Sequence, residues 1–212
     1  MPVFEDLANM IITGQHSAAA EWAETELSNG TPPEDIIEKG MIPGMDEIGR
    51  RWKDQEIHMP EVLIAARAMK AAMAIVKPQL QNSADTSRGS VVIGTVKGDL
   101  HDIGKNLVVM MLEGAGYTVH DLGNDVPPEA FVKATEENDV DIVAMSALLT
   151  TTVPMMTETI EALKEAELRT KVKVMIGGAP VSDELAKQIG ADGYAPDGAS
   201  AVDAISALIP AS

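Results

Sequence analysis

The chain of 212 residues contains no cysteine. This absence excludes disulfides, thiolate metal sites and cysteine nucleophiles, and it is typical of proteins from a reducing compartment. No stretch approaches the roughly 20 consecutive apolar residues that a membrane-spanning helix needs. The N-terminus also lacks the basic and apolar regions of a secretory signal peptide. We therefore expect a cytoplasmic protein that does not associate with membranes.

Aromatic residues and positive charge are scarce as well. Only two tryptophans, two tyrosines and two phenylalanines are present, and 16 basic residues face 33 acidic ones, which gives a formal net charge of −17 at pH 7. Nucleic acids attract clusters of Lys and Arg and often stack on aromatic side chains, so the composition disfavours a nucleic-acid partner. We interpret the acidic surface as a feature that favours solubility.

The pattern of apolar residues changes once along the chain. Residues 3–81 show apolar spacings near 3.6, which predict four or five helices. The stretch NSADTSRG at 82–89 is polar and non-periodic, as in a short linker. The sequence therefore predicts a helical domain at 1–81, a linker at 82–89 and a second domain at 90–212.

Beyond the linker, apolar β-type runs alternate with helical segments. The predicted strands are 91–96, 117–121, 141–146, 172–176 and a weak fifth at 191–194; the predicted helices are 103–115, 127–138, 153–167, 181–189 and 198–209. Such alternation favours a parallel sheet covered by helices on both faces. We predict the α/β class, with a flavodoxin-like, doubly wound, five-stranded sheet in the order 2-1-3-4-5. Ligands bind such sheets at the carboxyl ends of the strands, near the switch point.

The most informative residues follow the first predicted strand, in the stretch VVIGTVKGDLHDIG at 91–104. Asp99 and His101 are two positions apart, so in an extended segment both side chains project to the same side. A carboxylate that accepts the Nδ1 proton fixes the tautomer of a histidine and leaves Nε2 for a metal. The alternative is an ordinary loop histidine, with Asp99 as the N-cap of the next helix.

A phosphate-binding loop and a simple metal site both fit this turn less well. Neither GxGxxG nor GxxxxGK[ST] is present, which disfavours a phosphate-binding loop. A metal site of Asp99, His101 and Asp102 lacks further ligands, and two carboxylates with one histidine do not select a particular ion.

The order and spacing of three elements resemble a known family. Asp99-x-His101-x-x-Gly104 is followed by Ser146-x-Leu148 and then by Gly177-Gly178, as in the cobalamin-binding domain of corrinoid proteins and of cobalamin-dependent methionine synthase. The segment MIPGMDEIGRRWKDQEIHMPEV at 41–62 is similar to the helical cap of corrinoid proteins that work with methyltransferases. The resemblance spans nearly the whole chain.

The resemblance implies roles for individual residues. His101 becomes the axial ligand of cobalt, Asp99 holds His101, and Ser146 extends this hydrogen-bond relay. The cofactor is cobalamin or a related corrinoid, carried as methylcobalamin and in the Co(I), Co(II) and Co(III) states. The implied cofactor-binding residues are Gly98, Asp99, Leu100, His101, Asp102, Ile103, Gly104, Ser146, Leu148, Leu149, Thr150, Thr151, Gly177, Gly178, Tyr194 and Ala195.

Four residues of the helical half are candidates to shield the upper face of the corrin. They are Met41, Met45, Trp52 and Met59. Apolar residues at helical spacing also serve ordinary helix packing, which is the alternative for each of them.

By resemblance the chain is a methyl carrier rather than a complete enzyme, because cobalt supplies the reactivity and the protein supplies binding and protection. Its partners are then a substrate-specific methyltransferase, a corrinoid-dependent folate or thiol methyltransferase and a reductive activase. We expect O-demethylation of methoxylated aromatics, with methylamines, glycine betaine or methanol as alternative donors. A cobalamin-dependent sensor and an adenosylcobalamin mutase subunit are alternatives of other classes, and a phosphoacceptor receiver is disfavoured because Ser146 and Ala195 stand where such proteins need Asp and Lys.

Overall fold

The computed structural model describes residues 4–80 and 87–209. The chain divides into two compact units, one formed mainly by residues up to Ser87 and one that begins at Arg88. The predicted domain boundaries stay a prediction, and residues 82–86 of the predicted linker lie outside the described residues. No described helix is long and apolar enough to cross a membrane.

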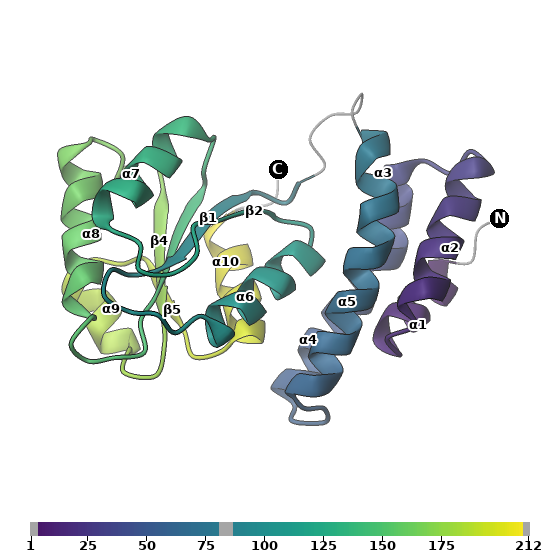
Figure 1. Cartoon of the computed structure of the whole chain (residues 1–212), viewed down its shortest axis with the longest axis horizontal. Coiled ribbons are helices and arrows are strands. Elements are labelled where there is room, and N and C mark those ends of the chain that lie inside the picture. Colours follow the sequence, from purple (N-terminus) through teal and green to yellow (C-terminus); the bar gives the residue numbers. More distant parts are fainter. Residues whose placement is uncertain (1–3, 81–86, 210–212) are drawn as a thin grey trace. The chain divides into compact units, whose positions relative to one another are not determined.

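The N-terminal unit consists of helices (Figure 1). They are α1 (Phe4–Ile12), α2 (His16–Ser28), α3 (Pro33–Ile36), a π-helical turn (Ile37–Met41), α4 (Ile42–Lys53), α5 (Met59–Val76) and a 3₁₀ turn (Lys77–Leu80). Helices α2 and α5 pack along each other, and both bury alanines. Such small side chains allow the two helix axes to approach closely.

The second unit contains the parallel sheet. Its elements are β1 (Ser90–Thr95), α6 (Ile103–Gly114), β2 (Thr118–Asp121), α7 (Pro128–Glu137), β3 (Ile142–Ser146), α8 (Pro154–Glu165), β4 (Lys173–Gly177), α9 (Asp183–Ile189), β5 (Gly193–Ala195) and α10 (Gly198–Leu208). The strands are hydrogen-bonded in the order β2-β1-β3-β4-β5 and all pairs are parallel. The predicted fold class and strand order are therefore confirmed.

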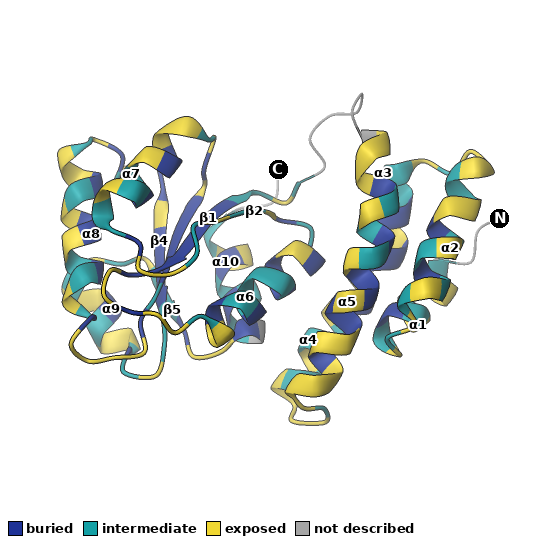
Figure 2. Ribbon diagram, viewed as in Figure 1, coloured by how far each residue is buried: buried dark blue, intermediate teal, exposed yellow. Residues whose placement is uncertain are grey.

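Helices cover both faces of this sheet. Figure 1 shows α7, α8 and α9 on one side of the strands and α6 and α10 on the other. Strands β1, β3 and β4 are buried almost throughout, and Figure 2 shows β1 and most of β4 in dark blue or teal between helices with exposed outer faces. Strands buried on both faces read as continuous apolar runs, which is why SVVIGT, IVAMS and KVMIG lack alternation.

The core between the sheet and α7 is built around Phe131. Its side chain is fully buried. It packs against Gly94 of β1, where an added Cβ would lie only 2.9 Å from the Phe131 ring. A strand without a side chain at this position thus makes room for the largest fully buried side chain among the described residues of the unit.

Replacing this ring should destabilise the sheet unit. We expect Phe131→Ala to lower the free energy of unfolding by about 3–5 kcal/mol, because it leaves a cavity against β1. The matched control on the same helix is Lys133→Ala, an exposed position where the change should stay within about 0.5 kcal/mol. Urea unfolding followed by far-UV circular dichroism measures both. Equal effects of the two substitutions would contradict this account of the core.

Candidate functional site

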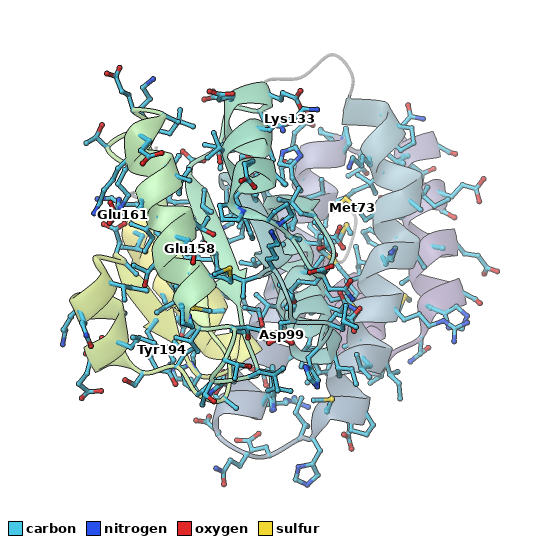
Figure 3. The ribbon with its side chains drawn as sticks, turned by 60° about the vertical axis from the view of Figure 1, so that its left-hand side comes forward. Met73, Asp99, Lys133, Glu158, Glu161 and Tyr194 are labelled. Carbon is cyan, nitrogen blue, oxygen red and sulfur yellow. The ribbon has the colours of Figure 1, made fainter. Side chains whose placement is uncertain are left out.

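The residues singled out from the sequence gather at the carboxyl ends of the strands. Asp99 and His101 follow β1, Leu148 and Leu149 follow β3, and Tyr194 lies in β5. Figure 3 shows Asp99 and Tyr194 near the same end of the sheet unit, with Lys133 of α7 toward the opposite end. This is the edge where parallel α/β sheets bind their ligands.

The carboxylate of Asp99 is the centre of this arrangement. Its side chain is fully buried. Oδ2 accepts hydrogen bonds from the amides of Leu148 (2.7 Å) and Leu149 (3.1 Å) and from the hydroxyl of Thr152 (2.9 Å). Oδ1 accepts from the His101 ring at Nδ1 (2.7 Å) and from the His101 amide (3.1 Å). All of these groups are donors, so they select the ionised carboxylate.

This surrounding changes the acidity of Asp99. Burial alone opposes the charged form, but the hydrogen bonds from the Leu148 amide, from the side chain and amide of His101 and from Thr152 outweigh it. They hold the pKa of Asp99 well below its usual range. The carboxylate is therefore ionised at neutral pH, and the proton between it and the imidazole resides on Nδ1 of His101.

The geometry of His101 leaves one ring nitrogen available to a metal. Nδ1–H donates to Asp99, and among the described residues no hydrogen bond engages Nε2. The side chain is 52% exposed, so Nε2 is accessible. The backbone of His101 is held as well, because the Thr95 hydroxyl donates to the His101 carbonyl at 3.0 Å. A ring nitrogen that donates to a carboxylate, with the second nitrogen accessible, is the usual arrangement of a metal-binding histidine.

The protein offers one histidine but no ligand set around it. In the part of the chain that the structure describes, no group of three or more His, Cys, Asp or Glu side chains could hold a metal ion. The simple metal site of Asp99, His101 and Asp102 is therefore not supported, since Asp99 is surrounded by donors. A metal that already carries its other ligands, as in a macrocycle, fits a single exposed imidazole.

Exposed apolar side chains lie in the loop of the histidine and in the neighbouring β3–α8 loop. Leu100 is 69% and Ile103 75% exposed, and Leu148 and Leu149 of the next loop are exposed too. A Cβ added at Gly104 would meet no atom within 4 Å, so packing does not require glycine there. These residues thus offer exposed apolar area in the loop of the imidazole and in the neighbouring loop, which fits a large flat cofactor.

Glycine at the end of β4 is required by the backbone itself. Gly178 has φ +122°, and an added Cβ would lie 1.8 Å from the Ala147 carbonyl oxygen. Gly177 pairs with Ser146 in the sheet register, and the Ala147 amide donates to the Gly177 carbonyl at 3.2 Å. The two glycines therefore bring β4 close to the loop that holds Asp99.

The hydroxyl that reaches Asp99 belongs to Thr152, which the sequence pattern did not single out. Ser146, the predicted relay residue, ends β3 between Thr95 and Gly177, and it is not among the described donors to Asp99. Thr150 and Thr151 are exposed, whereas Thr152 is buried. The only sequence signal for Thr152 was its place in a run of threonines after Leu149.

The remaining predicted residues lie near this centre or in the helical unit. Gly98 precedes Asp99, the carbonyl of Asp102 accepts from Asn106 in the first turn of α6, and Ala195 is buried at the end of β5. Met41 and Met45 are buried, which agrees with the helix-packing alternative, Trp52 is partly buried, and Met59 is 41% exposed. Contact of these four with a corrin stays a prediction.

Comparison with known proteins identifies the family. Residues 89–206 match the family described as "B12 binding domain", and residues 3–77 match a second family of the same description. The chain belongs to the B12-binding family. The predicted corrinoid cofactor is thereby confirmed, and the geometry around His101 fits that cofactor.

Relatives extend over nearly the whole of this B12-binding chain. A corrinoid protein from Desulfitobacterium hafniense is 40% identical over 96% of this chain and 95% of its own length. Dimethylamine corrinoid protein 1 from Methanosarcina acetivorans is 44% identical over 94% of both chains. The methanol:cobalamin methyltransferase complex MtaBC from Methanosarcina barkeri aligns with a TM-score of 0.86 at 30% identity, over 96% of this chain and 78% of that one.

The ionised state of Asp99 should make stability depend on pH. In Asp99→Asn the amide NH₂ must face a donor, so we expect a loss of about 1–3 kcal/mol at pH 7. Because the folded pKa lies below the unfolded value of about 3.9, the advantage of the wild type is complete above that value. It should shrink as the pH falls below about 4. Urea unfolding of both cofactor-free proteins at pH 7 and pH 3 measures this, and an equal difference at both pH values would contradict it.

The two glycine positions should respond in opposite ways to alanine. Gly178→Ala should lower the free energy of unfolding by about 3 kcal/mol, since it adds a clash and strains the backbone. Gly104→Ala should raise it by about 0.5–1 kcal/mol, because glycine is unfavourable within a helix. Urea unfolding of the cofactor-free proteins compares them. A loss at Gly104 as large as that at Gly178 would mean that packing, not ligand access, requires Gly104.

Proposed function

We propose that this corrinoid protein carries a methyl group on the cobalt of its cofactor between two methyltransferases, with His101 as the axial cobalt ligand. The observation that carries the proposal is the 2.7 Å hydrogen bond between His101 Nδ1 and the buried Asp99 carboxylate, which leaves Nε2 accessible. When bound, the corrinoid supplies a cobalt centre that accepts and releases methyl groups.

The residues of the chain would hold and adjust this cofactor. Asp99 would orient the imidazole and keep the proton on Nδ1 through the charge-assisted hydrogen bond. Thr152 has one hydroxyl proton, and its Oγ1 lies 2.9 Å from Asp99 Oδ2 and 2.9 Å from the Leu149 carbonyl oxygen. It can therefore strengthen or weaken its support of the carboxylate by turning its hydroxyl toward one acceptor or the other.

The surface around His101 would supply binding and exclude water. Leu100, Ile103, Leu148 and Leu149 offer apolar area that is exposed in the described residues. By the resemblance, the nucleotide tail of the cofactor would lie near the end of β4, close to Ser146 and Tyr194. Burial of exposed apolar groups by a ligand is favourable by roughly 25 cal/mol per Å².

A carrier role is supported by the extent of the resemblance. The dimethylamine corrinoid protein covers both units of this chain, and the MtaBC complex pairs a cobalamin protein with a methyltransferase. We propose the same kinds of partner here: a substrate-specific methyltransferase, a corrinoid-dependent folate or thiol methyltransferase and a reductive activase. A cytoplasmic location stays a prediction from the sequence.

For the methyl donor, we propose methylamines ahead of the methoxylated aromatics that the sequence suggested. The support is the 44% identity with a dimethylamine corrinoid protein. The test incubates the reduced holoprotein with a dimethylamine-specific methyltransferase and carbon-14 dimethylamine, or with an O-demethylating methyltransferase and a labelled methoxylated aromatic. Label that co-elutes with the protein in only the second mixture would favour O-demethylation instead.

The axial ligand is tested first. We expect wild-type protein reconstituted with cobalamin, desalted and reduced to Co(II) to show splitting of the EPR signal by nitrogen-15-labelled histidine. His101→Ala should lose this splitting, because the imidazole is removed while its loop keeps the other contacts. His120→Ala is the control, since His120 lies in β2 and should leave the splitting intact. Histidine splitting that persists in His101→Ala would contradict the assignment of His101 as the axial ligand.

A further inference from the structure

A second loop lies along the loop that carries His101. After β2 ends, the Thr95 amide donates to the Gly123 carbonyl (3.0 Å) and the Val126 amide donates to the Thr95 carbonyl (3.0 Å). Val96 and Val126 form an isolated parallel bridge. The β2–α7 loop, residues 122–127, therefore continues alongside the β1–α6 loop, residues 96–102.

Asp125 of the β2–α7 loop binds two consecutive residues of the neighbouring loop. Its carboxylate Oδ1 accepts from the Gly98 amide at 2.7 Å, and its own amide donates to the Asp99 carbonyl at 3.0 Å. Asn124 adds a longer contact from its side chain to the Leu100 carbonyl, at 3.3 Å. Three successive residues before His101 are thus held from this side.

The backbone of Asp125 is in an unusual conformation. Its φ is +54°, in the left-handed region that costs an L-residue about 1–2 kcal/mol and that aspartate and asparagine tolerate best. Strained residues persist where surrounding contacts determine them, and they concentrate at functional sites. Here the two hydrogen bonds to Gly98 and Asp99 accompany the strain.

The start of the β2–α7 loop is fixed by an ion pair whose lysine is buried and whose aspartate is partly exposed. Lys105, in the first turn of α6, has a side chain that is 1% exposed, and its Nζ lies 2.6 Å from both carboxylate oxygens of Asp121. Asp121 also accepts from the Gly123 amide at 2.9 Å. The ion pair therefore connects the start of the β2–α7 loop to α6, the helix that follows His101. Asp125 thus contacts the β1–α6 loop from a loop whose own start is held in position.

We propose that Asp125 is a positioning residue for the axial ligand His101, and that it acts through the backbone of Gly98 and Asp99. The Asp99 carboxylate is held by the β3–α8 loop, and Asp125 holds the Asp99 backbone from the β2 side. Together the two contacts fix the orientation of the Asp99 carboxylate, and this carboxylate orients the His101 ring. This inference rests on the proposed role of His101 as the cobalt ligand.

A merely structural role predicts a different result. A left-handed residue in a turn can stabilise the fold without affecting the imidazole, and Glu167 (φ +58°), just beyond the end of α8, is such a residue. The end of α8 leads into the beginning of β4, at the edge of the sheet opposite to the site. Glu167→Gly is thus the matched control for Asp125→Gly.

The test compares histidine-bound and histidine-free Co(II) in the reconstituted full chain. Glycine accepts the left-handed φ and keeps the amide at position 125, so Asp125→Gly removes the carboxylate contact without breaking the turn. We expect the ratio of histidine-bound to histidine-free EPR signal to fall about fivefold, as for the loss of one hydrogen bond. Asp125→Asn keeps an acceptor oxygen and should restore the ratio to within about twofold, and Glu167→Gly should leave it unchanged.

The outcomes separate this inference from the proposed function. A wild-type ratio in Asp125→Gly, with histidine splitting present in the wild type, overturns the positioning role. An equal fall in Glu167→Gly overturns it too, since a general loss of order would then explain both. Absence of histidine splitting from the wild type overturns the proposed function, and this inference with it. Unfolding temperatures of the cofactor-free variants verify that each one is folded.

Discussion

The buried carboxylate of Asp99 is the group on which the rest of the site depends. Every neighbour that the structure gives it is a donor, so among the described residues the negative charge is stabilised by hydrogen bonds rather than by a lysine or arginine. The charge in turn keeps a proton on Nδ1 of His101, so that Nε2 is the nitrogen left on the outer side of the ring. A buried acid thereby specifies the chemistry of an exposed base.

The sheet topology explains how such a carboxylate can be held. In the order β2-β1-β3-β4-β5, strand β1 has β2 on one side and β3 on the other, so the loop after β1 lies between two other loops. The β3–α8 loop contributes amides to the Asp99 side chain, and the β2–α7 loop binds its backbone through Asp125. The position of β1 at the switch point of the sheet thus allows Asp99 to be held by the loops that follow both neighbouring strands.

The geometry also explains why one histidine suffices. Among the described residues no group of three or more His, Cys, Asp or Glu side chains could hold a metal ion, and the loops around His101 carry exposed leucine and isoleucine side chains. An apolar surface suits a cofactor that brings its own equatorial ligands, and the family to which the chain belongs binds such a cofactor. In the proposed function, the protein therefore orients the cofactor and contributes one metal ligand, His101, whereas the metal chemistry belongs to the cofactor.

The sequence by itself determined the fold class and the Asp99–His101 pair, because these depend on local patterns: buried strands as apolar runs, and two side chains separated by one residue. The strand order followed from the fold class, since 2-1-3-4-5 is a common order of doubly wound sheets. Only the tertiary structure decided that Thr152 supplies the hydroxyl to Asp99 and that Asp125 binds Gly98. Thr152 is 53 residues from Asp99, and Asp125 is 27 residues from Gly98. Adjacent threonines point in different directions in a turn, and which of them faces a buried carboxylate is set by backbone dihedrals that the packing of the β3–α8 loop fixes.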